Sequence, residues 1–297
     1  MNTSWWKRLK AHLVGYSFIA PAVLLVLAFL VYPIVFVIYI SFNKYNILLA
    51  PSPVGLANYK FVFADPNFWN AVLNTIYFVG LAVPFQMIVG LLMAVMLNNE
   101  LKARGVFRTI FFVPMAISFV AAGIIFNWIF SPSPLPGLVP TVFTSLGLKF
   151  PDWQGSQGGW AMIIILIMNT WKSTGYTMVV YLAGLQGINR EFYEAADVDG
   201  AKPGWQMFRY ISWPMLWPTT FLLIVTTTIF SVRAFQPFYV MTSGGPAGAT
   251  TTLVYYVFKK FPDLMGISSA GATVMLVAVA GLTILQFIAN RRREIYY

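Results

Sequence analysis

Six long apolar runs decide what this chain can fold into. They lie at about 14–40, 69–97, 106–130, 159–184, 215–240 and 269–289. Each run supplies the roughly 20 residues that a helix needs to cross a hydrocarbon core of about 30 Å. Only 9% of the 297 residues are charged, whereas a soluble domain averages about 25%. The expected fold class is an all-α polytopic membrane protein, with six transmembrane helices forming one domain over residues 14–290.

The positive charges alternate from one connection to the next. Twelve of the 19 Lys and Arg residues fall in four segments on one side of the six crossings: the tail 1–13, the connection near 102–108, the loop 185–214 and the tail 291–297. The opposite connections hold Lys44, Lys60, Lys149, Lys259 and Lys260. The positive-inside rule therefore places both termini and the loop 185–214 in the cytoplasm. The loops on the other side are too short for a folded extracellular domain.

Residue types that are scarce or missing exclude several kinds of chemistry. The chain has no cysteine, and its one histidine is His12 in the N-terminal tail, so we expect no disulfide and no metal site. No GxxxxGK[ST] phosphate-binding loop occurs, so the chain has no nucleotide site of that kind. The net charge of +10 reflects topology in so apolar a chain, and no nucleic-acid partner is expected. The first run is too long for the core of a signal peptide.

The cytoplasmic loop 185–214 contains a polar hairpin with the sequence features of two short helices. Asn189 is a suitable N-cap, and acidic residues follow in the first turns, where the helix dipole favours them. Gly200 is a natural helix terminator, and Pro203 suits the first turn of a second helix. On that second helix Trp205, Phe208 and Ile211 or Ser212 form an apolar stripe. The loop is therefore expected to present two short helices to the cytoplasm.

The same loop resembles the EAA signature of binding-protein-dependent ABC importer permeases. The signature is Glu-Ala-Ala, three residues, Gly, about nine residues, then Ile-x-Leu-Pro. The matching residues are Glu194, Ala195, Ala196, Gly200, Ile211 and Pro214. The stretches "NTWKSTGY" and "YLAGLQGI" before these residues and "TSGGP" after them occur in the expected order. They are similar to the carbohydrate-uptake branch, the MalF/UgpA-like permeases. The resemblance covers the chain from about residue 14 onward.

The loop departs from that signature in two places. Ten residues rather than nine separate Gly200 from Ile211, and Trp213 stands where the signature has Leu. A wider turn near Lys202 to Gly204 would absorb the extra residue. The contact that the second helix makes is the part affected by this expansion.

The resemblance implies a type I ABC importer permease in a prokaryotic inner membrane. The EAA loop would dock on a cytoplasmic ATPase through its coupling residues, which are Glu194, Ala195, Ala196, Asp197, Gly200 and Phe208. Gly244, Gly245 and Pro246 would contact an extracytoplasmic solute-binding protein. The implied partners are a second, MalG-like permease subunit, two ATPase copies, that binding protein and membrane lipid. ATP and Mg²⁺ would be used by the ATPase, so this chain would be no enzyme and would hold no cofactor.

Polar residues inside the fourth and fifth runs are candidates for a substrate pathway, because they are costly in hydrocarbon. Asn169, Ser173 and Tyr176 share one helix face, and Thr227, Ser231 and Ala234 repeat that spacing beside Phe230. The resemblance assigns these faces to a sugar cavity, whereas hydrogen bonding between helices is the plainer explanation. Gln86, Asn127 and Trp128 are weaker candidates, and Met115 with Phe119 would make an apolar wall.

Lys172 and Arg233 are the only cations deep in the runs. They could bind an anionic substrate such as a phosphorylated or acidic sugar, reach an interface, or pair within the complex. A structural or gating role is favoured.

Two other classes of protein remain as alternatives. A polytopic membrane transferase would use the acidic cluster of the loop 185–214, but the spacing of those acids lacks paired metal ligands. A secondary transporter would need buried ionisable pairs or an internal repeat, and neither is evident.

Overall fold

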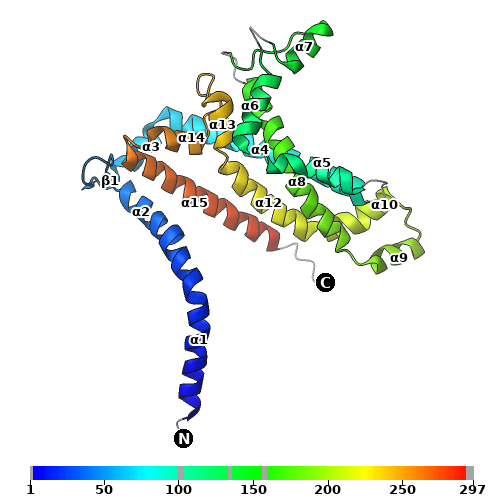
Figure 1. Cartoon of the computed structure of the whole chain (residues 1–297), viewed down its shortest axis with the longest axis horizontal. Coiled ribbons are helices and arrows are strands. Elements are labelled where there is room, and N and C mark those ends of the chain that lie inside the picture. Colours follow the sequence, from blue (N-terminus) through cyan, green and yellow to red (C-terminus); the bar gives the residue numbers. More distant parts are fainter. Residues whose placement is uncertain (1–2, 99–103, 133–135, 156–158, 292–297) are drawn as a thin grey trace. The chain divides into compact units, whose positions relative to one another are not determined.

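The computed structural model describes residues 3–98, 104–132, 136–155 and 159–291, with side chains from residue 15 onward. Nearly all of this is helix (Figure 1), which confirms the all-α prediction. The chain divides into two compact units, one of Met1–Asp65 with Val257–Leu276 and one of Pro66–Tyr256 with Val277–Tyr297. The side chains of residues 3–14, among them His12, are not described, and neither are residues 1–2 and 292–297 at the ends of the two predicted tails.

The first unit contains the first predicted span and the connection that follows it. Its elements are α1 (Thr3–Val26), the π-helical η1 (Leu27–Val31), α2 (Tyr32–Ser41), strands β1 (Asn43–Lys44) and β2 (Ser52–Pro53), which pair antiparallel, and α3 (Ala57–Ala64). Helix α1 already begins at Thr3, so the predicted tail 1–13 is mostly continuous with the first span. Asn58 closes the connection, because its side-chain amide donates to the carbonyls of Ser41 and Asn43, each at 2.9 Å.

The second unit carries most of the remaining helices. They are α4 (Pro66–Asn98), α5 (Arg104–Ala116), α6 (Phe119–Ile129), α7 (Leu138–Ser145), α8 (Gly159–Gln186), α9 (Arg190–Val198), α10 (Trp205–Met207), the π-helical η2 (Phe208–Ser212), α11 (Trp213–Met215), α12 (Trp217–Val232) and α13 (Gln236–Thr242). Helices α14 (Leu253–Lys260) and α15 (Met265–Asn290) have residues in both units.

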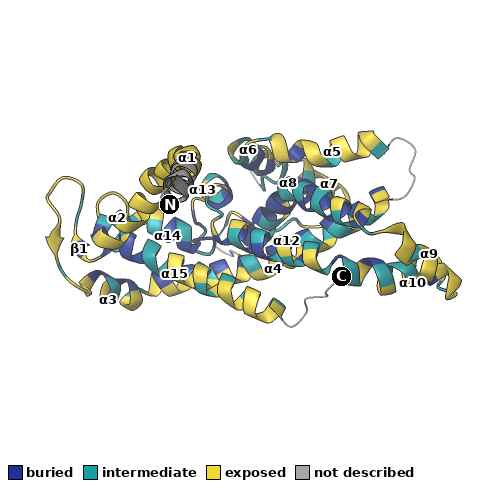
Figure 2. Ribbon diagram, turned by 90° about the horizontal axis from the view of Figure 1, so that it is seen from below, coloured by how far each residue is buried: buried dark blue, intermediate teal, exposed yellow. Residues whose placement is uncertain are grey.

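Helix α8 is the centre of the second unit and packs mainly along α4. Figure 2 shows buried residues on α4, α8 and α12, whereas the second half of α15, residues 277–290, has no buried residue. Helices α4 and α8 approach closely at Gly90, where a Cβ would lie 2.7 Å from the Thr177 side chain. Near that crossing the Gln86 amide donates to the Thr177 hydroxyl at 2.8 Å. Small and polar residues of this kind are typical of helix contacts inside membrane proteins.

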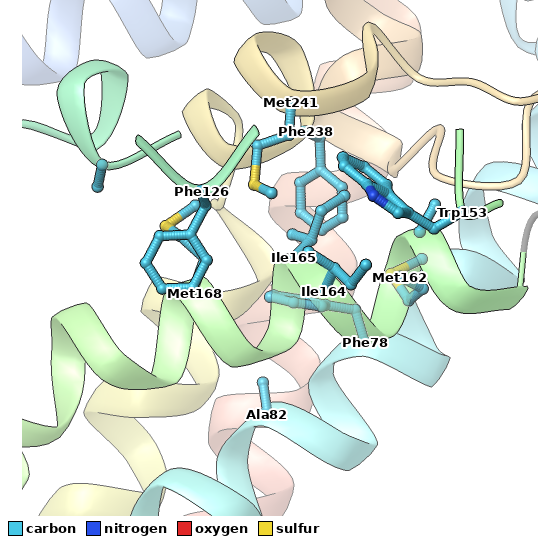
Figure 3. Close-up of a cluster of buried hydrophobic side chains, with 12 residues drawn as sticks. Phe78, Ala82, Phe126, Trp153, Met162, Ile164, Ile165, Met168, Phe238 and Met241 are labelled. Carbon is cyan, nitrogen blue, oxygen red and sulfur yellow. The ribbon is translucent and has the colours of Figure 1, made fainter. Parts of the chain in front are cut away.

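The apolar core of this unit lies where α4, α6, α8 and α13 meet (Figure 3). Phe78 and Phe238 pack edge to face with ring centroids 4.8 Å apart. Trp153, which is fully buried, donates its indole N–H to the Phe130 carbonyl at 2.7 Å. The connection between α7 and α8, which carries Trp153, is thereby attached to the end of α6.

The predicted spans are helical, but two of them are bent. Three helical segments are long and apolar enough to cross a membrane, Gly15–Ser41, Pro66–Asn98 and Met265–Asn290, and up to five if two bent pairs each count as one span. Helix α8, with 28 residues, is long enough for a sixth span but is not among those five, and Asn169 and Lys172 make its middle less apolar. The described part of the chain is therefore compatible with the six spans predicted.

The bends correct the prediction of plain spans over 106–130 and 215–240. The third run is divided into α5 and α6, which meet at 100°, after Pro114 and before the N-cap Ser118. The fifth run divides once, where α12 ends at Val232 and α13 begins at Gln236, and the 63° bend between the helix Trp205–Met215 and α12 lies at its start. Apolarity alone does not reveal such breaks, because apolar residues continue on both sides of each break.

Candidate functional site

A cavity of about 590 Å³ opens among α4, the α5–α6 bend, α8, α12 and α13. It is lined by Gln86, Met115, Phe119, Asn169, Lys172, Ser173, Tyr176, Phe230, Ser231, Arg233, Ala234, Phe235, Gln236 and Pro237. All of these residues belong to the second unit. The lining is contributed by four separate stretches of sequence, so the cavity exists only in the folded chain.

Seven of the eight predicted pathway residues line this cavity. They are Asn169, Lys172, Ser173, Tyr176, Phe230, Ser231 and Arg233. Thr227 is the exception: it is 2% exposed and its hydroxyl donates back to the Leu223 carbonyl, one turn earlier in α12. Because its hydroxyl is bonded within its own helix, Thr227 does not take part in the lining, and its place in the substrate pathway stays a prediction.

The cavity combines polar groups with aromatic faces. Asn169 and Ser231 are buried in the lining, whereas Phe230 remains 63% exposed. Ser173 and Tyr176 are half-buried beside them on α8. Amides and hydroxyls that stand beside a ring are suited to a small polar ligand with an apolar face.

The two cations of the cavity differ in their surroundings. Lys172 is 7% exposed, and its Nζ donates to the Met115 carbonyl at 3.0 Å and lies 4.5 Å from the centroid of the Phe119 ring. Arg233 is exposed at the C-terminal end of α12. No acidic residue is among the described lining residues. Lys172 is therefore engaged inside the fold, and the Arg233 guanidinium is the more accessible positive charge.

Sequence reasoning missed part of the lining. Phe235, Gln236 and Pro237 enter the cavity because the chain turns between α12 and α13. Pro237 within the fifth run was the available signal for that break. Of the weaker candidates, Gln86, Met115 and Phe119 do line the cavity.

Asn127 and Trp128 lie elsewhere. The Asn127 amide is directed to the Val240 carbonyl at 3.4 Å, and Trp128 is exposed. Neither residue is among those that line the cavity.

The predicted coupling loop begins with a capped helix. The Asn189 side chain accepts from the Glu191 N–H at 3.2 Å, as its N-cap prediction requires. Gly200, at φ +83°, ends α9, and the Ala201 N–H returns to the Ala196 carbonyl at 2.9 Å. This arrangement has the bonding of a Schellman termination, which favours Gly at the left-handed position.

The predicted coupling residues on and just after α9 differ in exposure. Glu194, Ala195, Asp197 and Gly200 are exposed, whereas Ala196 is buried. Tyr193, which precedes them, shares a hydrogen bond with the Ser212 hydroxyl at 2.9 Å and so ties α9 to the second helix. The exposed residues form a face that a partner can reach, while Ala196 packs within the chain.

The second helix of the loop begins later than predicted. Pro203 lies in the turn, and the helix starts at Trp205 after Gly204, whose φ is +92°. Glycine allows this positive φ without strain, so the turn widens at the place suggested for the extra residue of the EAA signature. The π-helical turn η2 is a second site that accommodates an additional residue before Trp213.

The Phe208 side chain packs against other parts of the chain. It is half-buried, lies between Trp205 and Trp213 at centroid distances of 5.8 and 6.3 Å, and lines a hollow of about 560 Å³ with residues of α4 and Leu185. Its ring is thus placed between the coupling loop and the ends of the membrane helices.

The TSGGP loop is a hydrogen-bonded turn with a buried glycine. A Cβ at Gly244, where φ is +80°, would lie 2.5 Å from the Tyr255 ring, so only glycine fits. The Tyr255 hydroxyl donates to the Ser243 carbonyl at 2.8 Å, and burial together with the neighbouring Tyr239 raises the pKa of the Tyr255 phenol. Gly245 and Pro246 are half-exposed, so they can touch a partner where Gly244 cannot.

Metal binding finds no support in the described ranges, where no group of three or more His, Asp or Glu side chains is arranged to hold an ion.

Comparison with known proteins places this geometry in a family. Residues 86–295 match the model of the binding-protein-dependent transport system inner membrane component. The lactose transport system permease protein LacF of Rhizobium radiobacter is 38% identical, over 94% of this chain and 95% of that protein. The trehalose/maltose transport system permease protein MalF of Thermococcus litoralis is 33% identical over 95% of each.

A solved structure has the same fold over nearly its whole length. The bacterial alginate ABC transporter, in complex with its alginate pentasaccharide-bound periplasmic protein, contains a chain that superposes with a TM-score of 0.84 at 26% identity. The superposition covers 97% of this chain and 97% of that chain. The chain is a multi-pass membrane protein that belongs to the binding-protein-dependent transport system inner membrane components, the permease subunits of ABC importers.

Proposed function

We propose that this chain is the permease subunit of an ATP-driven importer for a sugar or oligosaccharide and forms half of its translocation pathway. The observation that carries the proposal is the cavity lined by Asn169, Ser231 and Phe230. Its volume of about 590 Å³ lies within the range of about 300–1,000 Å³ common to small-molecule sites. Hydroxyl and amide groups would bond sugar hydroxyls, and the aromatic ring would cover the apolar face of a sugar ring.

The names of the relatives support this substrate class. LacF is named for lactose, MalF for trehalose and maltose, and the superposed transporter carries alginate. Alternating access would expose the cavity to each side of the membrane in turn, and a second permease subunit would supply the other half of the pathway.

Energy would come from a cytoplasmic ATPase that docks on the coupling loop. Glu194 and Asp197 are exposed on α9 and can pair with cations of a partner. Phe208, placed between the loop and the membrane helices, would transmit the movement rather than form the docking surface. Two ATPase copies would bind ATP and Mg²⁺, one for each permease subunit, with both termini of this chain in the cytoplasm.

On the opposite side, a solute-binding protein would deliver the sugar. Gly245 and Pro246 are half-exposed in the hydrogen-bonded TSGGP turn and would contribute to that contact. The superposed alginate transporter was solved with its periplasmic protein bound, which supports a partner of this kind.

Substitution in the cavity tests the substrate assignment. In the assembled importer, Ser231→Ala and Asn169→Ala should each raise the apparent KM for the transported sugar by about tenfold, the effect of one lost hydrogen bond in a dry site. Thr226→Val is the matched control, because the Thr226 hydroxyl donates to the Leu222 carbonyl at 2.8 Å within α12. Unchanged uptake by both cavity variants would remove the assignment.

Charge reversal on the coupling loop tests the ATPase contact. Glu194→Arg should abolish uptake and the copurification of the ATPase subunit, whereas Asp199→Arg, beyond the end of α9, should retain both. An importer that keeps its ATPase and its uptake with Glu194→Arg would contradict docking at this residue.

An anionic sugar is a second candidate, because the described lining contains the exposed Arg233 and no acid. Arg233→Gln separates the two candidates. Uptake of an anionic sugar should fall sharply in that variant, whereas uptake of a neutral sugar should be retained.

A further inference from the structure

The bend in the third span leaves backbone carbonyls without helical partners. Met115 is the penultimate residue of α5. Its carbonyl is therefore one of the last four of the helix, which accept no hydrogen bond from within it. At the start of α6, the Ser118 hydroxyl accepts from the Ala121 N–H at 3.1 Å and caps the new helix. The N-terminal end of α6 is thus capped locally, whereas the C-terminal end of α5 needs a donor from elsewhere.

Lys172 of α8 supplies that donor. Its Nζ lies 3.0 Å from the Met115 carbonyl oxygen, which is the negative end of α5 and favours a cation. The same ammonium lies 4.5 Å from the Phe119 ring centroid, in the first turn of α6. One side chain therefore contacts the last turn of one helix and the first turn of the next, across a 100° bend.

The backbone of α8 reinforces this contact. Gly175, three residues beyond Lys172, brings α8 so close to α5 that a Cβ would lie 2.5 Å from the Phe111 carbonyl. The bend is therefore fixed at two levels, the backbone contact at Gly175 and the side chain of Lys172. Met115 and Phe119, which Lys172 holds, are also the apolar wall of the cavity.

We propose that Lys172 is a positioning residue that holds the α5–α6 bend against α8 and thereby sets the apolar wall of the cavity. It does not bind the substrate through its charge, because the Met115 carbonyl and the Phe119 ring already surround its ammonium. The inference rests on the proposed function only where it describes the cavity as a sugar site. Its structural part, the angle of the bend, can be measured without any transport.

Distance measurements across the bend test the structural part. The chain has no cysteine, so spin labels on Val106→Cys in α5 and Ile124→Cys in α6 would be the only labels on it, and both native side chains are exposed. An unbent helix would separate these positions by about 27 Å, and a bend near 100° brings them to roughly 18 Å. In the assembled importer, Lys172→Met should broaden the distance distribution and shift it to longer values.

Three further variants make the result specific. Lys172→Arg keeps a cation that can donate to the carbonyl and stack on the ring, so it should preserve the native distribution. Phe119→Leu retains the hydrogen bond and should give an intermediate distribution. Thr170→Val is the matched control on α8, because the buried Thr170 hydroxyl has no partner among the described residues, and it should leave the bend unchanged.

Transport gives the functional readout. Lys172→Met should raise the apparent KM for a neutral sugar by about tenfold, and Lys172→Arg should restore it. If Lys172→Met alone fails to assemble while the Lys172→Arg and Thr170→Val variants assemble, the Phe119→Leu distances decide. An intermediate distance distribution in Phe119→Leu then supports the positioning role, and a native one contradicts it.

An unchanged distribution in Lys172→Met would overturn the inference, as would a loss of uptake confined to anionic sugars. A wild-type importer that moves no sugar but shows the narrow bend would instead refute the proposed function and leave Lys172 as the holder of the bend.

Discussion

The close crossing of α5 and α8 predicts a strong effect for the smallest possible substitution, Gly175→Ala. The added Cβ would lie 2.5 Å from the Phe111 carbonyl oxygen and 3.1 Å from the Phe112 Cα. Both are backbone atoms and cannot rotate away. Ordinary contact begins at 3.4 Å, so the two helices must separate by about 1 Å at this point.

The magnitude follows from two opposing effects. Alanine is favoured over glycine in a helix interior by about 1 kcal/mol. Overpacking of a tight interior costs about 1–3 kcal/mol. Gly80→Ala in α4 isolates the first effect, because nothing lies within 4 Å of a Cβ at Gly80. The two variants should therefore differ in unfolding free energy by about 1–3 kcal/mol, with Gly175→Ala the less stable.

Thermal unfolding of the purified importer in detergent measures this difference. Both variants should be compared in the same complex and lipid, and the Gly175→Ala midpoint should lie several degrees below that of Gly80→Ala. The displaced α5 should also raise the apparent KM, since Met115 at its end lines the cavity. Equal midpoints for the two variants would show that the helices do not approach at Gly175 as described.

Three other substitutions probe the loops. Tyr193→Phe removes the 2.9 Å hydrogen bond to Ser212 and should lower the sugar-stimulated ATPase rate of the importer while the complex still assembles; a rate equal to wild type would contradict a coupling role for that bond. Gly244→Ala places a methyl 2.5 Å from the Tyr255 ring at a φ of +80° and should cost about 1–3 kcal/mol, seen as a lower unfolding midpoint, which an unaltered midpoint would refute. Asn74→Ala removes two hydrogen bonds, of 3.0 Å each, to carbonyls of the 243–252 loop and should weaken stimulation by the binding protein, measured as its half-maximal concentration; the same concentration in variant and wild type would exclude the loop from that contact.

Parts of the candidate site were predictable because they follow from local rules. Helical spacing placed Asn169, Ser173 and Tyr176 on one face of α8, and all three line the cavity. The Asn189 cap and the Gly200 termination formed as predicted, since a cap and a left-handed glycine involve only neighbouring residues.

Other predictions depended on the contacts that a residue makes in the folded chain. Thr227 had the same spacing as Ser231, but its hydroxyl is satisfied within α12. Pro203 had the right preference for a helix start, yet the helix began two residues later, at Trp205. Spacing gives the face of a helix but not which of its polar groups remain unsatisfied.

The sequence by itself determined that this chain crosses a membrane, which loop carries the coupling signature, and which helix faces are polar. These properties depend on apolar length, charge distribution and residues close together along the chain. Only the tertiary structure decided that the third span bends by 100° and that Lys172 bonds to the Met115 carbonyl at that bend. It also decided that Gly244 is buried against Tyr255. The physical reason is that a carbonyl freed by a bend, or a glycine packed against a ring, has its partner on another helix. That partner is fixed only when the helices pack.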